Sequence, residues 1–199
     1  IWGLDVARSG SDSCALVKRR GAVVTGIKVW QSADLMATCG LVMAELEALP
    51  PSKQPTEILV DSIGIGAGVC DRLAELAPTS VRGINVAESQ SMKSGRFKRL
   101  RDELWWKTRE WLEGKDVRLP QDDRLLVELT APQYTIMSDG RIQAESKDSL
   151  KRRGVKSPDS ADALCLTFAS AATTASGGTR GYMSSWNKPL KQPTVNWVV

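Results

Sequence analysis

The sequence contains no histidine, and this absence excludes several classes of catalytic site. Ser-His and Cys-His nucleophiles use imidazole as their base, and many catalytic zinc sites use it as a ligand. Any acid, base or metal ligand must therefore come mainly from Asp, Glu, Lys, Tyr or Cys. The chain also lacks an apolar run of about 18 residues, the length needed to span a membrane. We therefore expect no contact with the bilayer interior.

Cysteines are few, and none forms a CxxC pair. They lie at positions 14, 39, 70 and 165, each among apolar residues, which is typical of buried thiols in a reducing compartment. The opening residues lack the basic and apolar segments of a signal peptide. They also lack an initiator methionine and begin inside an apolar run. We therefore expect the chain to be a fragment of a longer protein.

The 199 residues suit one domain, and a net charge of +4 gives a mild indication of a polyanionic partner. After residue 175 the chain is rich in Gly, Ser and Pro and has no apolar periodicity. Residues 1–175 are therefore predicted to form the folded domain, and residues 176–199 a flexible tail.

Apolar periodicity predicts an α/β domain with a central mixed sheet. Three strands joined by short turns come first, and two apolar strands alternating with helices follow, which indicates an antiparallel meander continued by parallel strands. The predicted strands are 1–7, 14–20, 22–31, 56–64 and 80–88, and a hairpin is expected at 133–144. Helices are predicted over 33–48, 64–76, 99–114, 119–131, 147–154 and from 157 onward.

Acidic residues stand at the ends of two predicted strands. Asp5 lies in the first strand, in "GLDVA", and Asp61 closes the fourth, in "ILVDS". Ligand-binding groups in open α/β sheets gather at the carboxyl ends of strands. The simpler explanations are a solvent-facing strand end for Asp5 and a turn cap for Asp61.

The last predicted helix adds two more acids. In "SPDSAD", Ser157 is the expected N-cap and Pro158 the first helical residue, so Asp159 and Asp162 lie on neighbouring positions of one face. Favourable interaction with the helix dipole accounts well for Asp159 but less well for Asp162, which lies between two alanines.

Clustered carboxylates without histidine favour Mg²⁺ or Mn²⁺. Two such ions about 3.5–4 Å apart can stabilise the attacking and leaving oxygens of a phosphodiester. Without a cation or a proton, the same carboxylates repel one another. We therefore expect either a metal site or acids that lie far apart.

Three motifs and a linking helix, in this order, resemble the carboxy-terminal nuclease domain of phage large terminase subunits. The resemblance spans residues 1–172 and implies a ribonuclease H-like fold, related to Holliday-junction resolvases and integrases, with a central mixed sheet of five or more strands flanked by helices. The segments that carry it are "IWGLDVARSGSDSCALV", "EILVDSIGIGAGVCDRL", "SGRFKRLRDELWW" and "KSPDSADALCLTFA".

The resemblance implies an endonuclease that cuts concatemeric double-stranded viral DNA with two Mg²⁺ or Mn²⁺ ions. Asp5 and Asp61 match the family's first two acids, and the third is either Asp159 or Asp162, with a slight preference for Asp162. The implied partners are DNA, an amino-terminal ATPase domain, the portal and the small terminase subunit, at the procapsid in the host cytoplasm. The P-loop motif of such an ATPase is missing here.

Two basic runs flank the acids and predict contacts with DNA phosphates, although such runs are commonly only solvated faces. The candidate residues are Lys93, Arg96, Lys98, Arg99, Arg101, Lys147, Lys151, Arg152, Arg153 and Lys156. The turn "IGIGAG" fits either a phosphate cradle or close strand–helix packing, and Trp105, Trp106 and Trp111 are predicted to be core residues.

Two alternatives belong to other functional classes. An actin-like or sugar-kinase ATPase half also begins with an acid in its first strand and carries a Gly-rich turn, and binding of ATP would favour it. A non-catalytic module that binds DNA or the portal would lack metal-dependent nicking of plasmid DNA.

Overall fold

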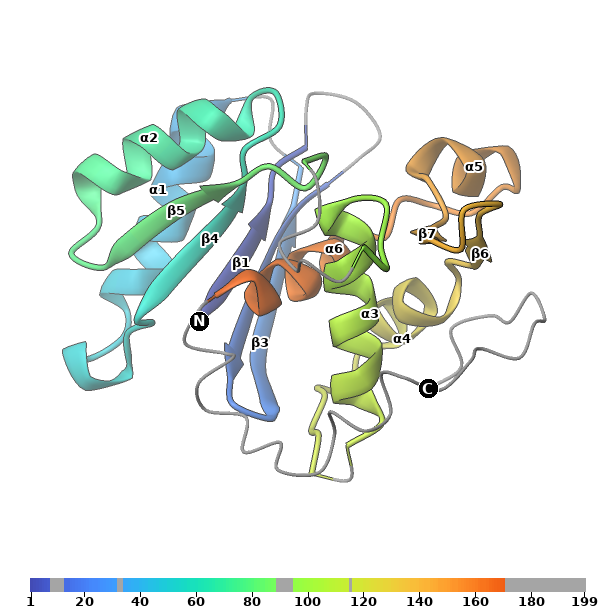
Figure 1. Ribbon diagram of the computed structural model, residues 1–199. Coiled ribbons are helices and arrows are strands. Elements are labelled where there is room, and N and C mark those ends of the chain that lie inside the picture. The colour runs from blue at the N-terminus through green and yellow to red at the C-terminus, as the bar shows by residue number, and fades with distance from the viewer. Residues whose placement is uncertain (8–12, 32–33, 89–94, 115, 171–199) are drawn as a thin grey trace.

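The computed structural model describes residues 1–7, 13–31, 34–88, 95–114 and 116–170 (Figure 1). Its main sheet has five strands in the order β3-β2-β1-β4-β5. Strands β1 to β3 form an antiparallel meander, and β4 and β5 run parallel to β1, which confirms the predicted mixed sheet. Their bounds are β1 Trp2–Asp5, β2 Cys14–Arg20, β3 Val23–Trp30, β4 Glu57–Asp61 and β5 Ser80–Ile84.

Helices cover both faces of this sheet (Figure 1). Helices α1 and α2 pack on one face, and α6, with α3 and α4 outside it, packs on the other. The helices are α1 Leu35–Glu47, α2 Gly66–Leu76, α3 Leu100–Leu112, α4 Asp123–Thr130, α5 Lys147–Arg152 and α6 Asp159–Leu166. Short 3₁₀ turns lie at Pro51–Lys53 and Thr167–Ala169. No helix in the described ranges is long and apolar enough to cross a membrane.

Strand β1 separates the two layers through its alternating side chains. Trp2 and Leu4 belong to the core beneath α1 and α2. On the opposite face, a Cβ atom at Gly3 would lie 1.9 Å from the carbonyl oxygen of Ala163 in α6. Only glycine permits this approach, so α6 lies directly against the β1 backbone, two residues from Asp5.

The glycine-rich turn after β4 has a packing role. A Cβ atom at Gly66 would lie 1.8 Å from the carbonyl oxygen of Asp61. Helix α2 therefore starts directly against the end of β4. Close strand–helix packing, one of the two interpretations of "IGIGAG", accounts for the glycine at this position.

The predicted hairpin is present as a separate two-stranded sheet, formed by β6 Tyr134–Ile136 and β7 Ile142–Ala144, and α5 follows it. The predicted start of α6 is wrong by one residue: Pro158 is the N-cap, Asp159 is the first helical residue, and Ser157 precedes the cap. The Ser157 hydroxyl finds no hydrogen-bond partner among the described residues. A carboxylate from α4 takes over the capping, as shown below.

The four cysteines are buried and unpaired, as predicted. Lys93 and the predicted tail at 176–199 lie outside the described residues.

Candidate active site

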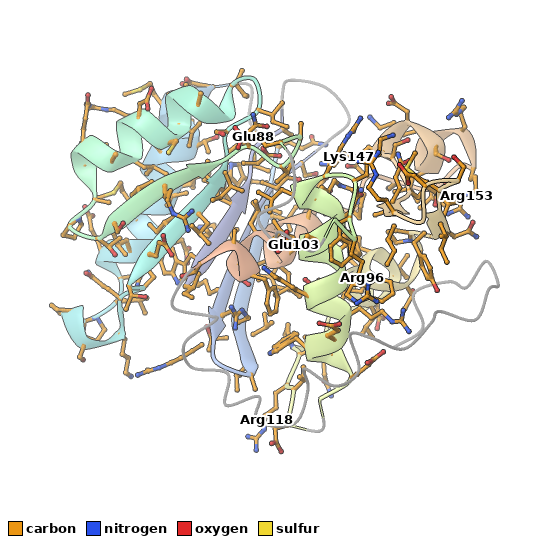
Figure 2. All side chains as sticks on the ribbon, in the orientation of Figure 1. Glu88, Arg96, Glu103, Arg118, Lys147 and Arg153 are labelled. Atoms are coloured by element: carbon orange, nitrogen blue, oxygen red, sulfur yellow. The ribbon has the colours of Figure 1, made fainter. Side chains whose placement is uncertain are left out.

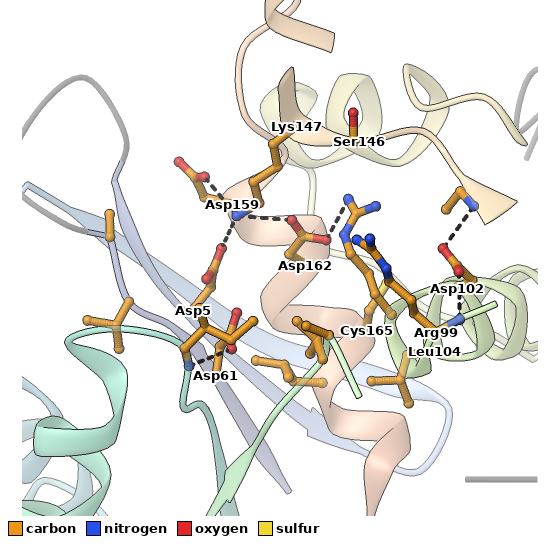
Figure 3. Close-up of a pocket in the computed structure, with 18 of the residues that line it drawn as sticks. Asp5, Asp61, Arg99, Asp102, Leu104, Ser146, Lys147, Asp159, Asp162 and Cys165 are labelled. Atoms are coloured by element: carbon orange, nitrogen blue, oxygen red, sulfur yellow. Dashed lines mark hydrogen bonds and ion pairs between the residues drawn. The ribbon is translucent and has the colours of Figure 1, made fainter. Parts of the chain in front are cut away.

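Four carboxylates from three elements line one cavity of about 350 Å³ (Figure 3). Asp5 ends β1 and Asp61 ends β4, so parallel pairing places both at the same edge of the sheet. Asp159 and Asp162 come from the first turn of α6. The structure therefore brings all four predicted acids together, including both alternatives for the third position.

The ammonium group of Lys147 lies among three of these carboxylates (Figure 3). Its Nζ atom is 3.0 Å from Asp5 Oδ2, 3.2 Å from Asp162 Oδ2 and 4.0 Å from Asp159 Oδ1. Lys147 is the first residue of α5, which reaches the cavity directly after the hairpin. The position between the acids is therefore one where a positive charge is stabilised.

Three of the four cavity carboxylates, Asp61, Asp159 and Asp162, each have an oxygen held by a hydrogen-bond donor of another residue. Asp159 Oδ2 accepts from the Ser13 backbone N–H at 3.0 Å, and Asp61 Oδ1 accepts from that of Ile63 at 3.1 Å. Asp162 Oδ1 accepts from Trp105 Nε1 at 2.7 Å and lies 3.1 Å from Arg101 Nη2. Anchoring one oxygen fixes the direction of the other, so the carboxylates are pre-oriented.

Burial and neighbouring charges shift the pKa values of the acids in different directions. Burial, with the charges of Asp162 and Asp61, raises the pKa of Asp5 to about 7 against the opposing effect of Lys147. Burial also raises the pKa of Asp61. Burial opposes ionisation of Asp162 as well, but Arg101 and Lys147 outweigh it and hold its pKa below the usual range. Asp5 is therefore more readily protonated than Asp162.

The donor set fits a hard divalent cation, because carboxylate oxygens are the ligands that Mg²⁺ and Mn²⁺ prefer. Within the described ranges, no three His, Cys, Asp or Glu side chains are grouped closely enough to hold a metal ion as they stand. The three carboxylates nearest Lys147 are instead spaced around its ammonium group. A metal at this position would require Lys147 to withdraw and the carboxylates to close in.

The predicted DNA-binding cations differ in their partners and in their exposure to solvent. Several already have partners: Arg101 pairs with Asp162, Arg153 with Glu145 at 2.6 Å, and Lys98 donates to Gln143 at 3.4 Å. Arg96 lies over the Trp106 ring, on the side of α3 shown in Figure 2. The side chains of Arg99, Lys151, Arg152, Arg153 and Lys156 are exposed to solvent. Their contact with DNA stays a prediction.

The sequence did not reveal the role of two residues in the site. Asp102 is buried and lines the cavity, where its carboxylate accepts from the backbone N–H groups of Arg99 and Ala144, both at 2.9 Å. Trp105 is a core residue as predicted, yet its indole N–H also holds Asp162. Arg101 and Trp105 lie one helical turn apart, so the sequence could indicate that they share one face of a helix. It could not indicate that this face contacts Asp162 in α6.

Comparisons with known proteins identify the fold. No family model matches the chain, and neither does any curated protein sequence. The structure is similar to the nuclease domain of the large terminase subunit gp2 of bacterial virus Sf6, with a TM-score of 0.61 and 18% identity over 83% of this chain and 86% of that one. It is also similar to the large terminase nuclease from thermophilic phage G20c, with a TM-score of 0.59 and 15% identity over 84% and 80% of the two chains.

Other structures of these two domains contain manganese, in the Sf6 protein, and magnesium, in the G20c protein. At such low identity the likeness establishes the fold. The chain therefore has the fold of these terminase nuclease domains, which agrees with the ribonuclease H-like fold that the sequence resemblance implied.

Proposed function

We propose that this chain is the metal-dependent endonuclease domain of a phage large terminase subunit, which cuts concatemeric double-stranded DNA during packaging. The observation that carries the proposal is the convergence of Asp5, Asp61, Asp159 and Asp162 on one cavity. The fold supports it, because the similar structures are terminase nuclease domains.

Asp5, Asp61 and Asp162 are the proposed ligands of two Mg²⁺ or Mn²⁺ ions, with Asp159 as the alternative third ligand. Manganese and magnesium in the similar nuclease domains support this choice of metals. When bound, such ions lower the pKa of the attacking water and stabilise the leaving oxygen of the phosphodiester. The chain itself orients the carboxylates, through Trp105, Arg101 and the Ser13 backbone N–H.

Lys147 acts in this proposal as a resident counter-charge. Its ammonium group relieves the repulsion among Asp5, Asp159 and Asp162. The side chain is long, flexible and 35% exposed, so it can withdraw toward solvent without disrupting α5. Metal binding and the Lys147 ion pairs are therefore expected to compete.

DNA is the proposed substrate, held through phosphate contacts by exposed cations near the cavity. Arg99 lines the cavity itself, and Arg152 and Lys156 lie on the segment that leads into α6. Phosphate contacts of this kind supply affinity without sequence preference. The resemblance adds the remaining partners of the proposal: an ATPase domain of the same subunit, the portal and the small terminase subunit, at the procapsid in the host cytoplasm.

Incubation of the chain with supercoiled plasmid tests this function. We expect nicked and linear products with Mn²⁺ or Mg²⁺ and none with EDTA. Asp61→Asn removes a ligand charge with little change of shape, so it should abolish cleavage while circular dichroism stays unchanged. Asp71→Asn, an exposed acid in α2, should cleave as the wild type does. Cleavage in EDTA, or full activity of Asp61→Asn, would contradict the metal site.

The same purified chain can be used to distinguish the two alternative functions. An ATPase half would bind ATP and would not cleave the plasmid. A non-catalytic module would shift DNA in a gel without nicking it.

A further inference from the structure

Helix α6 begins without a cap of its own. The first backbone N–H groups of a helix have no partner within it, and an N-cap side chain normally accepts from one of them, that of the second or third helical residue. Here the N-cap residue is Pro158, whose ring carries no acceptor. The Ser157 hydroxyl, the next acceptor along the chain, finds no partner among the described residues. The start of α6 therefore depends on an acceptor from elsewhere in the fold.

Glu128, on α4, supplies this acceptor. Its Oε2 atom accepts from the backbone N–H of Ser160 at 2.7 Å and from that of Ala161 at 3.0 Å. These are the second and third residues of α6, and an N-cap side chain would bind the N–H group of one or the other. Glu128 is only 6% exposed, so its negative charge faces the positive end of the helix dipole with little screening by water.

Arg124, one turn earlier on α4, completes the arrangement. Its Nε atom donates to Glu128 Oε1 at 2.6 Å, and its Nη2 atom lies 3.7 Å from Asp159 Oδ2. The guanidinium therefore links the capping carboxylate to one of the cavity acids. Neither Arg124 nor Glu128 lines the cavity, so both lie behind the proposed catalytic groups.

The position of the acids within α6 makes this cap consequential. Asp159 and Asp162 are the first and fourth residues of the helix. The middle of α6 is held against β1 by the contact between Gly3 and Ala163. In the first turn, the backbone N–H groups of Ser160 and Ala161, which have no acceptor within the helix, are bound by Glu128. Loss of the cap should therefore loosen the acids before it loosens the rest of the helix.

We propose that Glu128 is a positioning residue of the nuclease site: by capping α6 from α4, it holds the turn that directs Asp159 and Asp162 into the cavity. This role rests on the proposed function for its catalytic meaning. The contact itself does not depend on that function, and it can be tested without activity.

Glu128→Ala and Glu128→Gln provide the main test. The alanine leaves both amides without an acceptor, whereas the glutamine retains an amide oxygen for them. We expect Glu128→Ala to raise the half-saturating Mn²⁺ concentration for plasmid cleavage by about 10–100-fold, the usual effect of losing an outer-shell partner. The maximal rate at saturating Mn²⁺ should change much less. Glu128→Gln should stay close to the wild type in both measurements.

Asp34→Ala is the matched control. Asp34 is the N-cap of α1, where its side chain accepts from the Met36 backbone N–H at 2.9 Å. This change also removes a helix cap, but on the opposite face of the sheet. It should lower the melting temperature without changing the Mn²⁺ dependence. An unchanged Mn²⁺ dependence in Glu128→Ala, or an equal loss in Glu128→Gln, would overturn the capping role.

Amide hydrogen exchange and Mn²⁺ binding measured by electron paramagnetic resonance give readouts without turnover. Faster exchange at Ser160 and Ala161 in Glu128→Ala, but not in Asp34→Ala, supports the proposal, and unchanged exchange overturns it. If the wild type does not cleave DNA, the proposed function fails, and exchange still decides the role of Glu128. If Glu128→Ala does not fold, Glu128→Asp keeps the charge but withdraws it from the amides, and the same outcomes apply.

Discussion

The two faces of the main sheet differ in the charged side chains that they bury. Under α1 and α2 the core cluster consists of apolar residues such as Leu4, Val42 and Leu73. On the α6 face, charged side chains are buried beside the apolar ones, including Asp102, Asp159 and Glu128. Buried charges cost stability unless they are paired and hydrogen-bonded. Both faces therefore contribute an apolar core to the fold, and the α6 face also retains costly charged groups whose arrangement makes sense as a functional site.

The largest expected effect is a difference in cleavage activity between variants of the two acids of α6. Asp162 is 12% exposed toward the cavity and is kept ionised by Arg101, whereas Asp159 is 4% exposed and is anchored to the Ser13 backbone. We expect Asp162→Asn to abolish Mn²⁺-dependent cleavage and Asp159→Asn to reduce it about 10–100-fold, as for a supporting residue. Single-turnover rates with plasmid DNA measure both. The reverse order would make Asp159 the direct ligand.

Matched leucines test the division between the faces. Leu73 in α2 and Leu164 in α6 are both fully buried, so truncation to alanine should cost about 2–5 kcal/mol of unfolding free energy at either site. Denaturant unfolding measures this loss. Only Leu164→Ala should raise the Mn²⁺ concentration needed for cleavage, because it loosens the helix that carries the acids. An equal shift in Leu73→Ala would show that the faces are not functionally separate.

Exposed cations near the cavity should contribute to DNA binding in a salt-dependent way. Neutralising two phosphate contacts should flatten the slope of log K against log salt by up to about 1.8. Arg152→Ala with Lys156→Ala is the suitable pair, because Arg153 is engaged with Glu145. Arg20→Ala with Lys53→Ala, two exposed cations outside the predicted basic runs, is the control. Equal slopes in the two double variants would show that the basic run is only a solvated face and does not contact phosphates.

The smallest effect is a difference in pH dependence between the faces. Burial raises the pKa of Asp102 on the α6 side, although two backbone N–H groups oppose it. Its folded form therefore binds a proton more strongly than its unfolded form, and its contribution to stability falls as pH rises above about 4. On α1, hydrogen bonds from Lys18 and Lys28 lower the pKa of Glu45. Its contribution is present above about pH 4.3 and is lost as pH falls.

Chemical unfolding between about pH 3 and 7 measures both contributions. With rising pH, wild type should lose stability relative to Asp102→Asn and gain it relative to Glu45→Gln. Slopes of the same sign would contradict the assigned causes.

The sequence predicted the parts of the site that depend on local position. Asp5 and Asp61 end strands that pair in parallel, so their meeting at one edge follows from the strand order. The position of Lys147 could not be predicted in the same way, because it depends on how the hairpin and α5 fold back over the cavity. The prediction that Ser157 caps α6 was wrong for a related reason. Ser157 has the right chemistry and the right place in the sequence, yet Glu128, distant in the chain, occupies the amides.

The contact between Gly3 and Ala163 has a consequence for how precisely the site is spaced. No side chain lies between β1 and α6 at this point, so the separation of the two elements is set by backbone atoms touching. Asp5 follows Gly3 by two residues, and Asp162 precedes Ala163 directly. The distance between these carboxylates is therefore set by contact between backbone atoms, which are the same in every amino acid. Substitutions that enlarge or shrink the surrounding core can accumulate without resetting it, provided that position 3 stays glycine.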